Sequence, residues 1–210
     1  MLKSLSKRAK LISLIGGFLF GAVGALWSFV VVDRQNEEIK RLSDHKADLA
    51  RQVQSLNSIS YDYFIANQQG DLIYILAQQG NAHQDIASLV YKGNVLDRAT
   101  PVRNMLGALA IAKLLDYRQS YDAYEKINDA ARADPGSFEK FTRLKQVEKN
   151  IITAGQERVP PLLNEMFETD KAINAAEAVQ KRNRATGLAS SIFGSFLLLL
   201  ANLVADRKKG

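Results

Sequence analysis

The stretch LISLIGGFLFGAVGALWSFVVV, residues 11–32, decides the fold expected of this chain because it holds 22 residues without a charge. A helix of that length runs about 33 Å, which is enough to cross the hydrocarbon core of a bilayer. A second apolar stretch occupies residues 187–205, near the other end of the sequence. We therefore predict two transmembrane helices, at residues 11–32 and 187–205, with the rest of the chain organised around them.

A secretory signal peptide also begins with basic residues followed by an apolar run, and residues 23–25 resemble a small-residue cleavage site. The apolar core of a signal peptide has about 7 to 15 residues, whereas this run stays apolar through Trp27 and Phe29 to Val32. The length therefore favours an uncleaved membrane anchor over a signal peptide.

The net charge of +6 is distributed unevenly along the chain. Residues 1–10 carry four basic and no acidic side chains, residues 33–184 carry 21 of each sign, and residues 206–210 carry three basic side chains and one acidic one. Basic segments that flank membrane spans stay in the cytoplasm. We therefore predict cytoplasmic tails at residues 1–10 and 206–210 and an extracytoplasmic domain at residues 33–186.

The predicted orientation depends on the first span, because Lys181, Arg182 and Arg184 flank the second span on the side that we expect to be extracytoplasmic. The central domain is neutral, and without a basic face we expect no nucleic-acid partner. The chain has no Asn-x-Ser/Thr glycosylation site, which favours a bacterial source, and its lack of cysteine is compatible with an extracytoplasmic domain. We therefore expect it in a bacterial inner membrane.

Beyond residue 32 the apolar residues change to a heptad spacing, which predicts one continuous helix to about Asn67. The apolar residues at the a and d positions are Ile39, Leu42, Leu49, Val53, Leu56 and Tyr63. Such a pattern packs either against other helices of the same chain or against a second chain in a coiled coil. With fewer than about four clean heptads, packing within the chain is favoured.

Glycine and proline predict the ends of the later helices. Gly70 and Gly80 predict kinks or a turn, Gly93-Asn94 predicts a helix end, and Thr100-Pro101 predicts a new helix start. The sequence Asp134-Pro135-Gly136-Ser137 is typical of a turn, with Ser137 opening the next helix. Gly155 and the pair at residues 160–161 predict an interruption of that helix.

The run MLGALAIAKLL, residues 105–115, is nearly all apolar but too short to cross a bilayer, so it should be the most buried helix of the domain. Its predicted core residues are Leu106, Leu109, Ile111 and Leu115. Tyr117, Tyr121 and Tyr124 then share one helix face, where the edge of a core is favoured over a platform for a ligand.

No stretch alternates with the period of a strand, so the predicted fold class is all-α. Two transmembrane helices would flank an extended antiparallel bundle of about four helices. This layout resembles the sensor half of bacterial chemoreceptors and related transmembrane receptors, whose extracytoplasmic helical bundles run between two spans. Because only about five residues follow the second span, we expect this chain to lack the cytoplasmic output domain of those receptors.

Residue patterns for catalysis are missing from the sequence, so we expect neither an enzyme nor a cofactor. His45 has Asp44 and Asp48 nearby and His83 has Asp85, but four metal ligands are visible at neither place. We therefore predict no metal site. Acidic residues are dispersed among equal numbers of basic ones, as on a solvated surface. No pattern in the sequence supports a small-molecule ligand, although the domain does not exclude one.

Small residues recur every four positions in both apolar stretches. They are Ser13, Gly17, Gly21 and Ala25 in the first and Gly187, Ser191 and Ser195 in the second. Such stripes let membrane helices approach closely, although glycine and serine are also common in membrane helices for other reasons. The three consecutive steps in the first stretch favour a helix-packing surface, whose partner is the other span, a second copy or another membrane protein.

These observations favour a membrane-anchored interaction or assembly protein, an accessory subunit of a membrane complex that self-associates or binds another membrane protein. The alternative is a ligand sensor that transmits a shift of one span against the other. A pore is disfavoured because neither span carries a charge that would mark an ion path.

Overall fold

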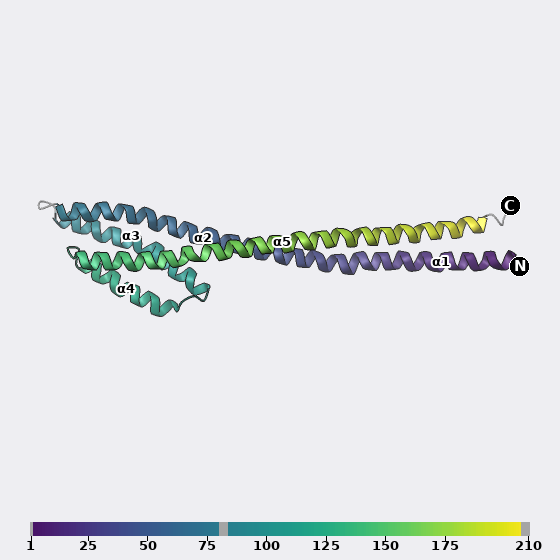
Figure 1. Cartoon of the computed structure of the whole chain (residues 1–210), viewed down its shortest axis with the longest axis horizontal. Helices are drawn as coiled ribbons and strands as arrows, with labels where there is room; N and C mark the ends of the chain where they lie inside the picture. The colour runs from purple at the N-terminus through teal and green to yellow at the C-terminus, as the bar shows by residue number, and fades with distance from the viewer. Residues whose placement is uncertain (1, 80–83, 207–210) are drawn as a thin grey trace. The chain divides into compact units, whose positions relative to one another are not determined.

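The computed structural model describes residues 2–79 and 84–206, and every regular element in those two ranges is a helix. The elements are α1 (Leu2–Leu26), the π-helical turn η1 (Trp27–Val31), α2 (Val32–Gln79), α3 (Gln84–Ile111), α4 (Tyr117–Ala133) and α5 (Phe138–Asp206) (Figure 1). The prediction of an all-α fold is confirmed. Gly80 and His83, which the sequence analysis singled out, lie outside the described residues.

The chain divides into two compact units, which we describe separately. The first, which we call the helix pair, comprises residues 1–47 and 167–210. The second, which we call the bundle, comprises residues 48–166. Helices α2 and α5 are each divided between the two units, with one segment in the helix pair and another in the bundle.

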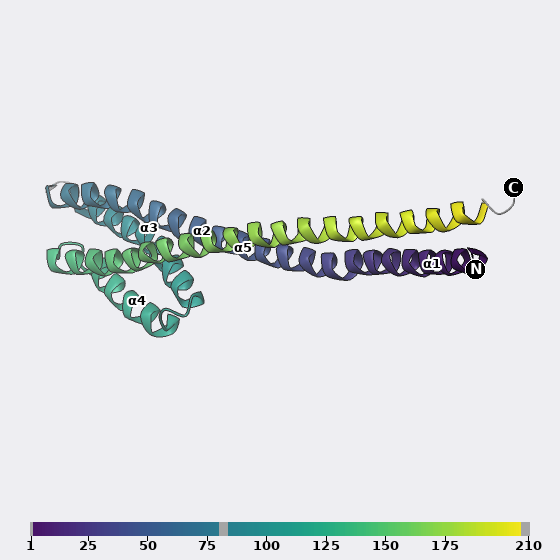
Figure 2. The same ribbon diagram turned by 45° about the vertical axis from the view of Figure 1, so that its right-hand side comes forward.

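In the helix pair, α1 and the start of α2 lie beside the last part of α5 in both views (Figures 1 and 2). Gly17 lies against Gly194, whereas Gly24 lies against Gly187. Because the numbers rise on one helix as they fall on the other, these two segments run in opposite directions. Farther along the pair, an ion pair joins Lys46 to Asp170.

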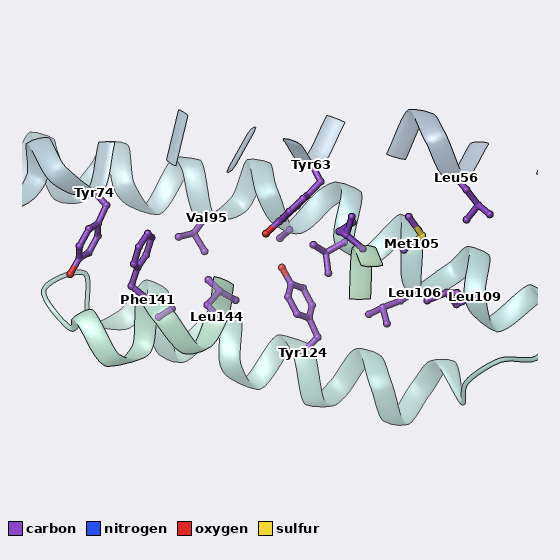
Figure 3. Close-up of a cluster of buried hydrophobic side chains, with 14 of the residues drawn as sticks. Leu56, Tyr63, Tyr74, Val95, Met105, Leu106, Leu109, Tyr124, Phe141 and Leu144 are labelled. Carbon is purple, nitrogen blue, oxygen red and sulfur yellow. The ribbon is translucent and has the colours of Figure 1, made fainter. Parts of the chain in front are cut away.

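The bundle has one continuous apolar core to which all four of its helices contribute (Figure 3). Tyr74 of α2 stacks on Phe141 of α5 with ring centroids 4.0 Å apart. The buried hydrophobic members of the core are Leu49, Leu56, Tyr63, Tyr74, Tyr91, Val95, Ala99, Val102, Met105, Leu106, Leu109, Tyr124, Ala131, Phe141, Leu144, Ile152 and Leu162. Leu49, Leu56 and Tyr63 are heptad residues of the sequence analysis, and they pack within the chain.

The predicted break between residues 93 and 101 is wrong, since α3 runs through it with Pro101 inside the helix. Val95 and Ala99 have no exposed surface, and the side-chain amide of Asn94 donates to the carbonyl of Ala66 on α2. The free energy gained by this tertiary packing outweighs the loss of one backbone hydrogen bond, which proline cannot form because it lacks an N–H.

The predicted interruption near residues 155–161 is also wrong, because α5 continues without a break. Gly155 faces Met105, and a Cβ atom at that glycine would clash with the methionine sulfur. The glycine therefore permits a close approach of α3 and α5 rather than ending a helix.

Leu106 and Leu109 are 1% and 3% exposed, whereas the placement of Ile111 in the core is wrong, since its side chain is 86% exposed. Ile111 stands two residues beyond Leu109, which turns it about 200° around the helix, away from the core. Leu115 packs partly against the core, but from the loop after α3 rather than from a helix.

Helix α3 ends at Ile111 although neither glycine nor proline follows it. Lys113 has a φ of 58°, the amide of Leu114 donates to Leu109 O and that of Lys113 donates to Ala110 O. These bonds form a Schellman motif with lysine in the left-handed position that glycine usually takes. Asp116 then caps α4 by accepting from the Gln119 amide at 2.8 Å.

The predicted turn at residues 134–137 is confirmed. The Ser137 amide donates to Asp134 O at 3.2 Å, and the Ser137 hydroxyl accepts from the Lys140 amide at 3.3 Å in the first turn of α5. A Ser side chain at this position satisfies one of the free amides at the helix start.

Candidate functional site

The helices of the helix pair meet along small residues. A Cβ atom added to Gly17 would lie 2.7 Å from Leu198 Cγ and 2.8 Å from Gly194 O. A Cβ atom added to Gly24 would lie 2.6 Å from Ser191 Oγ and 2.8 Å from Gly187 O. The two backbones therefore approach closely enough that only a residue without Cβ fits at these positions.

The predicted stripes coincide with this contact only in part. Gly17 and Gly187 are buried, and Gly21 and Ser191 are half-buried at the contact. Ser13 is half-buried, Ala25 is exposed, and Ser195 is exposed with its hydroxyl donating to Ser191 O of its own helix. The structure adds Gly24, Ser28 and Gly194, which the sequence analysis did not include.

The reason for the difference is the spacing of the contact residues. They follow one another at alternating intervals of four and three, as at residues 17, 21, 24 and 28, and not at a constant interval of four. Two helices packed at a small angle keep contact with that alternation, because it averages 3.5 residues per turn. Counting in sevens instead of fours would have found Gly24 and Gly194 from the sequence.

The π-helical turn η1 lies where this alternation is interrupted. The alternation predicts the next contact three residues after Ser28, but the next buried residue is Val32, four residues after it. A π-helical turn accommodates an extra residue in a helix. It therefore keeps the residues before and after it on the same contact face.

The outward surface of the helix pair is apolar along residues 11–32 and 187–203. Two helices of the described chain are long and apolar enough to cross a membrane, and only 17% of the most apolar window in each is buried. Phe18 and Phe29 are 71% and 77% exposed, and Ile192 and Leu203 are 61% and 64% exposed. Monomeric soluble proteins rarely expose apolar patches of this extent.

A second notable feature is a polar layer inside the bundle, with one member from each of its four helices. Tyr63 comes from α2, Arg98 from α3, Tyr124 from α4 and Glu148 from α5. The Tyr63 hydroxyl donates to Glu148 Oε2 at 3.3 Å, and the Tyr124 hydroxyl donates to Oε1 at 3.5 Å. Figure 3 shows the hydroxyl ends of the two tyrosines directed into the same part of the core.

Arg98 and Glu148 are both completely buried, with Arg98 Nε 3.2 Å from Glu148 Oε2. The contact between Arg98 Nε and Glu148 Oε2 is an ion pair, but its atoms are not aligned for a hydrogen bond. The two terminal nitrogens of Arg98 also have no hydrogen-bond partner. The guanidinium carbon lies 5.5 Å from the centre of the Phe141 ring. A Cβ atom at Gly70 would lie 2.6 Å from Arg98 Nη1, so that glycine makes room for the guanidinium group.

Burial raises the pKa of Glu148 to about 7, with the Arg98 charge and the two tyrosine hydroxyls opposing the shift. Burial also raises the pKa of Tyr63 and of Tyr124, and the neighbouring Glu148 charge adds to both shifts. The carboxyl group therefore titrates near neutral pH while both tyrosines stay protonated donors.

The sequence analysis missed this layer because it assigned the acidic residues to a solvated surface. The core positions of α3 recur at residues 91, 95, 98, 102, 105 and 109, so Arg98 occupies an apolar position of its own heptad. Glu148 likewise follows Leu144 by four residues and precedes Ile152 by four. A charged residue at an apolar heptad position was the available signal.

Tyr63 also lines a surface cavity of about 620 Å³ between α2 and α5. The other lining residues are Asn67, Phe138, Phe141, Thr142, Lys145, Gln146 and Lys149. Lys145 forms an ion pair with Asp71, and Asn67 Oδ1 is buried without a hydrogen-bond partner. The lining therefore combines three aromatic rings with two lysines, one of which is paired with Asp71.

The predicted tyrosine face divides in the structure. Tyr124 is 1% exposed in the core, whereas the rings of Tyr117 and Tyr121 lie 5.5 Å apart, with Tyr117 46% exposed. Among the described residues, no group of three or more histidine, cysteine, aspartate or glutamate side chains is arranged to hold a metal ion.

Comparison of the chain with protein-family models, with curated proteins and with solved structures gives no match.

Proposed function

We propose that this chain is a two-span protein of a bacterial inner membrane that acts in assembly, as an accessory subunit of a membrane complex. Both termini would be cytoplasmic, and an antiparallel four-helix bundle would stand outside the cytoplasm. The observation that carries this proposal is the exposed apolar surface of the helix pair, of which Phe18, Phe29 and Leu203 are examples.

A lipid environment accounts for two properties of the helix pair, its exposed apolar side chains and its contact through small residues. Contact of exposed phenylalanine and leucine side chains with acyl chains is favourable, whereas their contact with water costs free energy. Lipid also removes the hydrophobic drive that joins helices in water, so contact depends on close backbone approach at small residues. Gly24 against Gly187 is such a contact.

Assembly is favoured because the internal contact does not use up the apolar surface. The small residues of the two segments face each other, and the larger side chains, such as Phe29 and Ile192, point outward. These outward side chains are available to lipid, to a second copy or to another membrane protein.

Reporter fusions test the topology. A reporter at Gly210 should give a cytoplasmic signal, and one inserted in the turn at residues 134–136 should give an extracytoplasmic signal, because the basic segment at residues 1–10 is retained inside. Chain released from membranes by alkaline carbonate, or a cytoplasmic signal from the turn, would contradict the proposal.

The matched control concerns the basic residues before the second span. Replacing Lys181, Arg182 and Arg184 by glutamine should leave the sidedness of both reporters unchanged if the first span sets the orientation.

Ligand sensing is the second candidate function, and the cavity beside Tyr63 favours it. Tyr63 both lines that cavity and donates to the buried Glu148 carboxylate, so a bound molecule would contact the polar layer through one side chain. Lys149 and the aromatic lining, with Lys145 beside its partner Asp71, suit a small organic anion with a planar ring. Benzoate or a similar aromatic carboxylate should then raise the unfolding temperature of the wild type more than that of Tyr63→Phe. An equal shift, or none, would count against sensing.

A further inference from the structure

Helix α2 carries a second apolar face within the bundle, whose large side chains are all exposed in the described part of the chain. Five large apolar side chains form it: Tyr61, Phe64, Ile65, Leu72 and Ile75 are 65%, 53%, 38%, 66% and 51% exposed. We call this set the outer seam.

The outer seam lies opposite the core face of the same helix. Tyr63 and Tyr74 point into the core, each 8% exposed. Tyr61 and Leu72 stand two residues before them, which places both about 200° around the helix from the core residues. Tyr61, Ile65 and Leu72 therefore lie on the far side of the helix from the core, whereas Phe64 and Ile75 lie about 100° from the core residues.

The spacing of the outer seam is that of a coiled coil. Four of its members, together with Gln68, occupy positions 61, 65, 68, 72 and 75, which follow one another at intervals of four, three, four and three, and Phe64 flanks this line. That alternation keeps one line of side chains facing a second helix, and the partner it fits is therefore helical. The core face of α2, which packs against helices of its own chain, has the same alternation.

The charges near the outer seam allow it to meet an identical surface. Between Tyr61 and Ile75 the charged residues are Asp62 and Asp71, and Asp71 is already paired with Lys145. No cation lies among the seam positions for an acidic partner to recognise. Two copies of the seam would meet without opposing like charges at their centre.

We propose that the outer seam is a dimerisation surface whose occupant is the outer seam of a second copy of this chain, in a parallel and in-register coiled coil. The proposal rests on the proposed function, since two copies anchored in one membrane share one orientation. A two-fold axis along the membrane normal then places Leu72 opposite Leu72 and Ile65 opposite Ile65.

The available area is sufficient for a weak but specific dimer. The exposed parts of the five side chains amount to on the order of 500 Å² per copy, or about 1,000 Å² in a dimer, which is the lower size limit of specific interfaces. Confinement of both copies to one membrane raises their effective concentration, which compensates for a small interface.

Gln68 fixes the register of the proposed dimer. It is the one polar residue at a seam position, and its side chain is exposed. An amide both donates and accepts, so two Gln68 side chains satisfy each other only when the copies are aligned. A polar residue at one seam position of a coiled coil specifies register in the same way.

Single-cysteine crosslinking in membranes that contain the full chain tests the seam, and the natural sequence has no cysteine to interfere. Under oxidation, Leu72→Cys should form a disulfide-linked homodimer, whereas Ala130→Cys, on an exposed position of α4, should stay monomeric. Absence of a homodimer at Leu72→Cys, or a crosslink there to a different protein, would overturn the second copy as occupant.

A third cysteine separates this inference from the proposed function. Phe18→Cys reports association through the first apolar segment, where Phe18 is 71% exposed. A homodimer from Phe18→Cys without one from Leu72→Cys would leave assembly standing and overturn the seam. A homodimer from Leu72→Cys in chain that carbonate releases would overturn the membrane proposal and support the seam as an interface in solution.

Sedimentation of the full chain in detergent gives the strength of the contact. Leu72→Lys should weaken dimerisation at least tenfold, because two buried lysines would meet in the seam. The matched variant Leu163→Lys changes a residue of α5 that is 48% exposed and outside the seam. It should leave the dissociation constant of the dimer unchanged. Equal effects of the two variants would overturn the assignment.

Discussion

Helix α5 packs through small residues in the helix pair and through large ones in the bundle. In the helix pair its contact residues include Gly187 and Gly194, whereas in the bundle it presents Leu144, Ile152 and Leu162. In both segments the contact residues recur at intervals of three and four residues. The spacing therefore determines which face of a helix is in contact, and the size of the residues determines how closely the backbones approach.

The solvent explains why the two units use different residues. In water, burying a leucine or phenylalanine side chain stabilises a core by about 1.5–3 kcal/mol, so the bundle gains from large side chains. In lipid the same burial adds little stability, because lipid is itself apolar. There the helices gain van der Waals contact mainly where glycine lets their backbones approach. Under the proposed function, the bundle is exposed to water, and residues 11–32 and 187–205 of the helix pair are exposed to lipid.

The aromatic residues allow the two units to be monitored separately. All seven tyrosines lie between residues 61 and 124, in the bundle, and the single tryptophan is Trp27, in the helix pair. Near-ultraviolet circular dichroism of tyrosine and fluorescence of tryptophan therefore report on different units of the same detergent-solubilised protein.

The largest expected effect comes from breaking the polar layer. At a pH above the Glu148 pKa of about 7, where the wild-type carboxyl is ionised, Glu148→Leu leaves the buried Arg98 without a counter-ion. It should then destabilise the bundle by about 3–5 kcal/mol in chemical unfolding followed by tyrosine dichroism. The double variant Arg98→Met with Glu148→Leu should recover most of that loss, because an apolar pair fits an apolar core. A double variant as unstable as the single one would show that the charge is not the cause.

The pH dependence of the same unfolding free energy is the internal control. The pKa of Glu148 is raised to about 7 in the folded state from an ordinary value of 4.5, so the folded bundle holds this proton more tightly than the unfolded chain. Its contribution to stability is therefore complete below about pH 4.5 and is lost as the pH rises through about 7. The double variant should lack this part of the pH dependence.

An intermediate effect is expected from the apolar core of the bundle. Leu109→Ala should cost about 2–5 kcal/mol, since the side chain is 3% exposed. The matched variant Ile111→Ala changes a residue of the same helix that is 86% exposed and should change stability by less than about 0.5 kcal/mol. Similar losses in the two variants would contradict the outward orientation of Ile111.

The smallest effect is expected in the helix pair, where each contact in lipid is worth about 1 kcal/mol. Gly24→Ala should loosen the pair, because the new Cβ would lie 2.6 Å from Ser191 Oγ, whereas a Cβ at Gly21 meets no atom within 4 Å. A crosslink between cysteines at Phe20 and Phe193, whose rings lie 5.2 Å apart, measures the contact. It should weaken in Gly24→Ala and persist in Gly21→Ala, without change in the tyrosine dichroism of either. Equal crosslinking in both would argue against close packing at Gly24.

Local composition carried enough information to predict the all-α class and the turn at residues 134–137. The turn was predictable because Pro135 and Gly136 restrict the backbone locally, whatever surrounds them. The boundaries of α3 and α5 were not predictable in this way. Pro101 and Gly155 favour breaks in isolation, and only contacts with residues distant in sequence, such as Gly155 with Met105, keep both helices continuous.

The sequence by itself determined two apolar segments long enough for a membrane, a neutral helical domain between them and small residues in both segments. These properties depend on composition and local spacing. The tertiary structure alone decided that Gly24 and Gly194 lie in the contact while Ala25 does not, that Arg98 and Glu148 meet in the core, and that Ile111 faces outward. Each of these depends on which helix lies opposite, and that choice is made by packing across more than 40 residues of intervening chain.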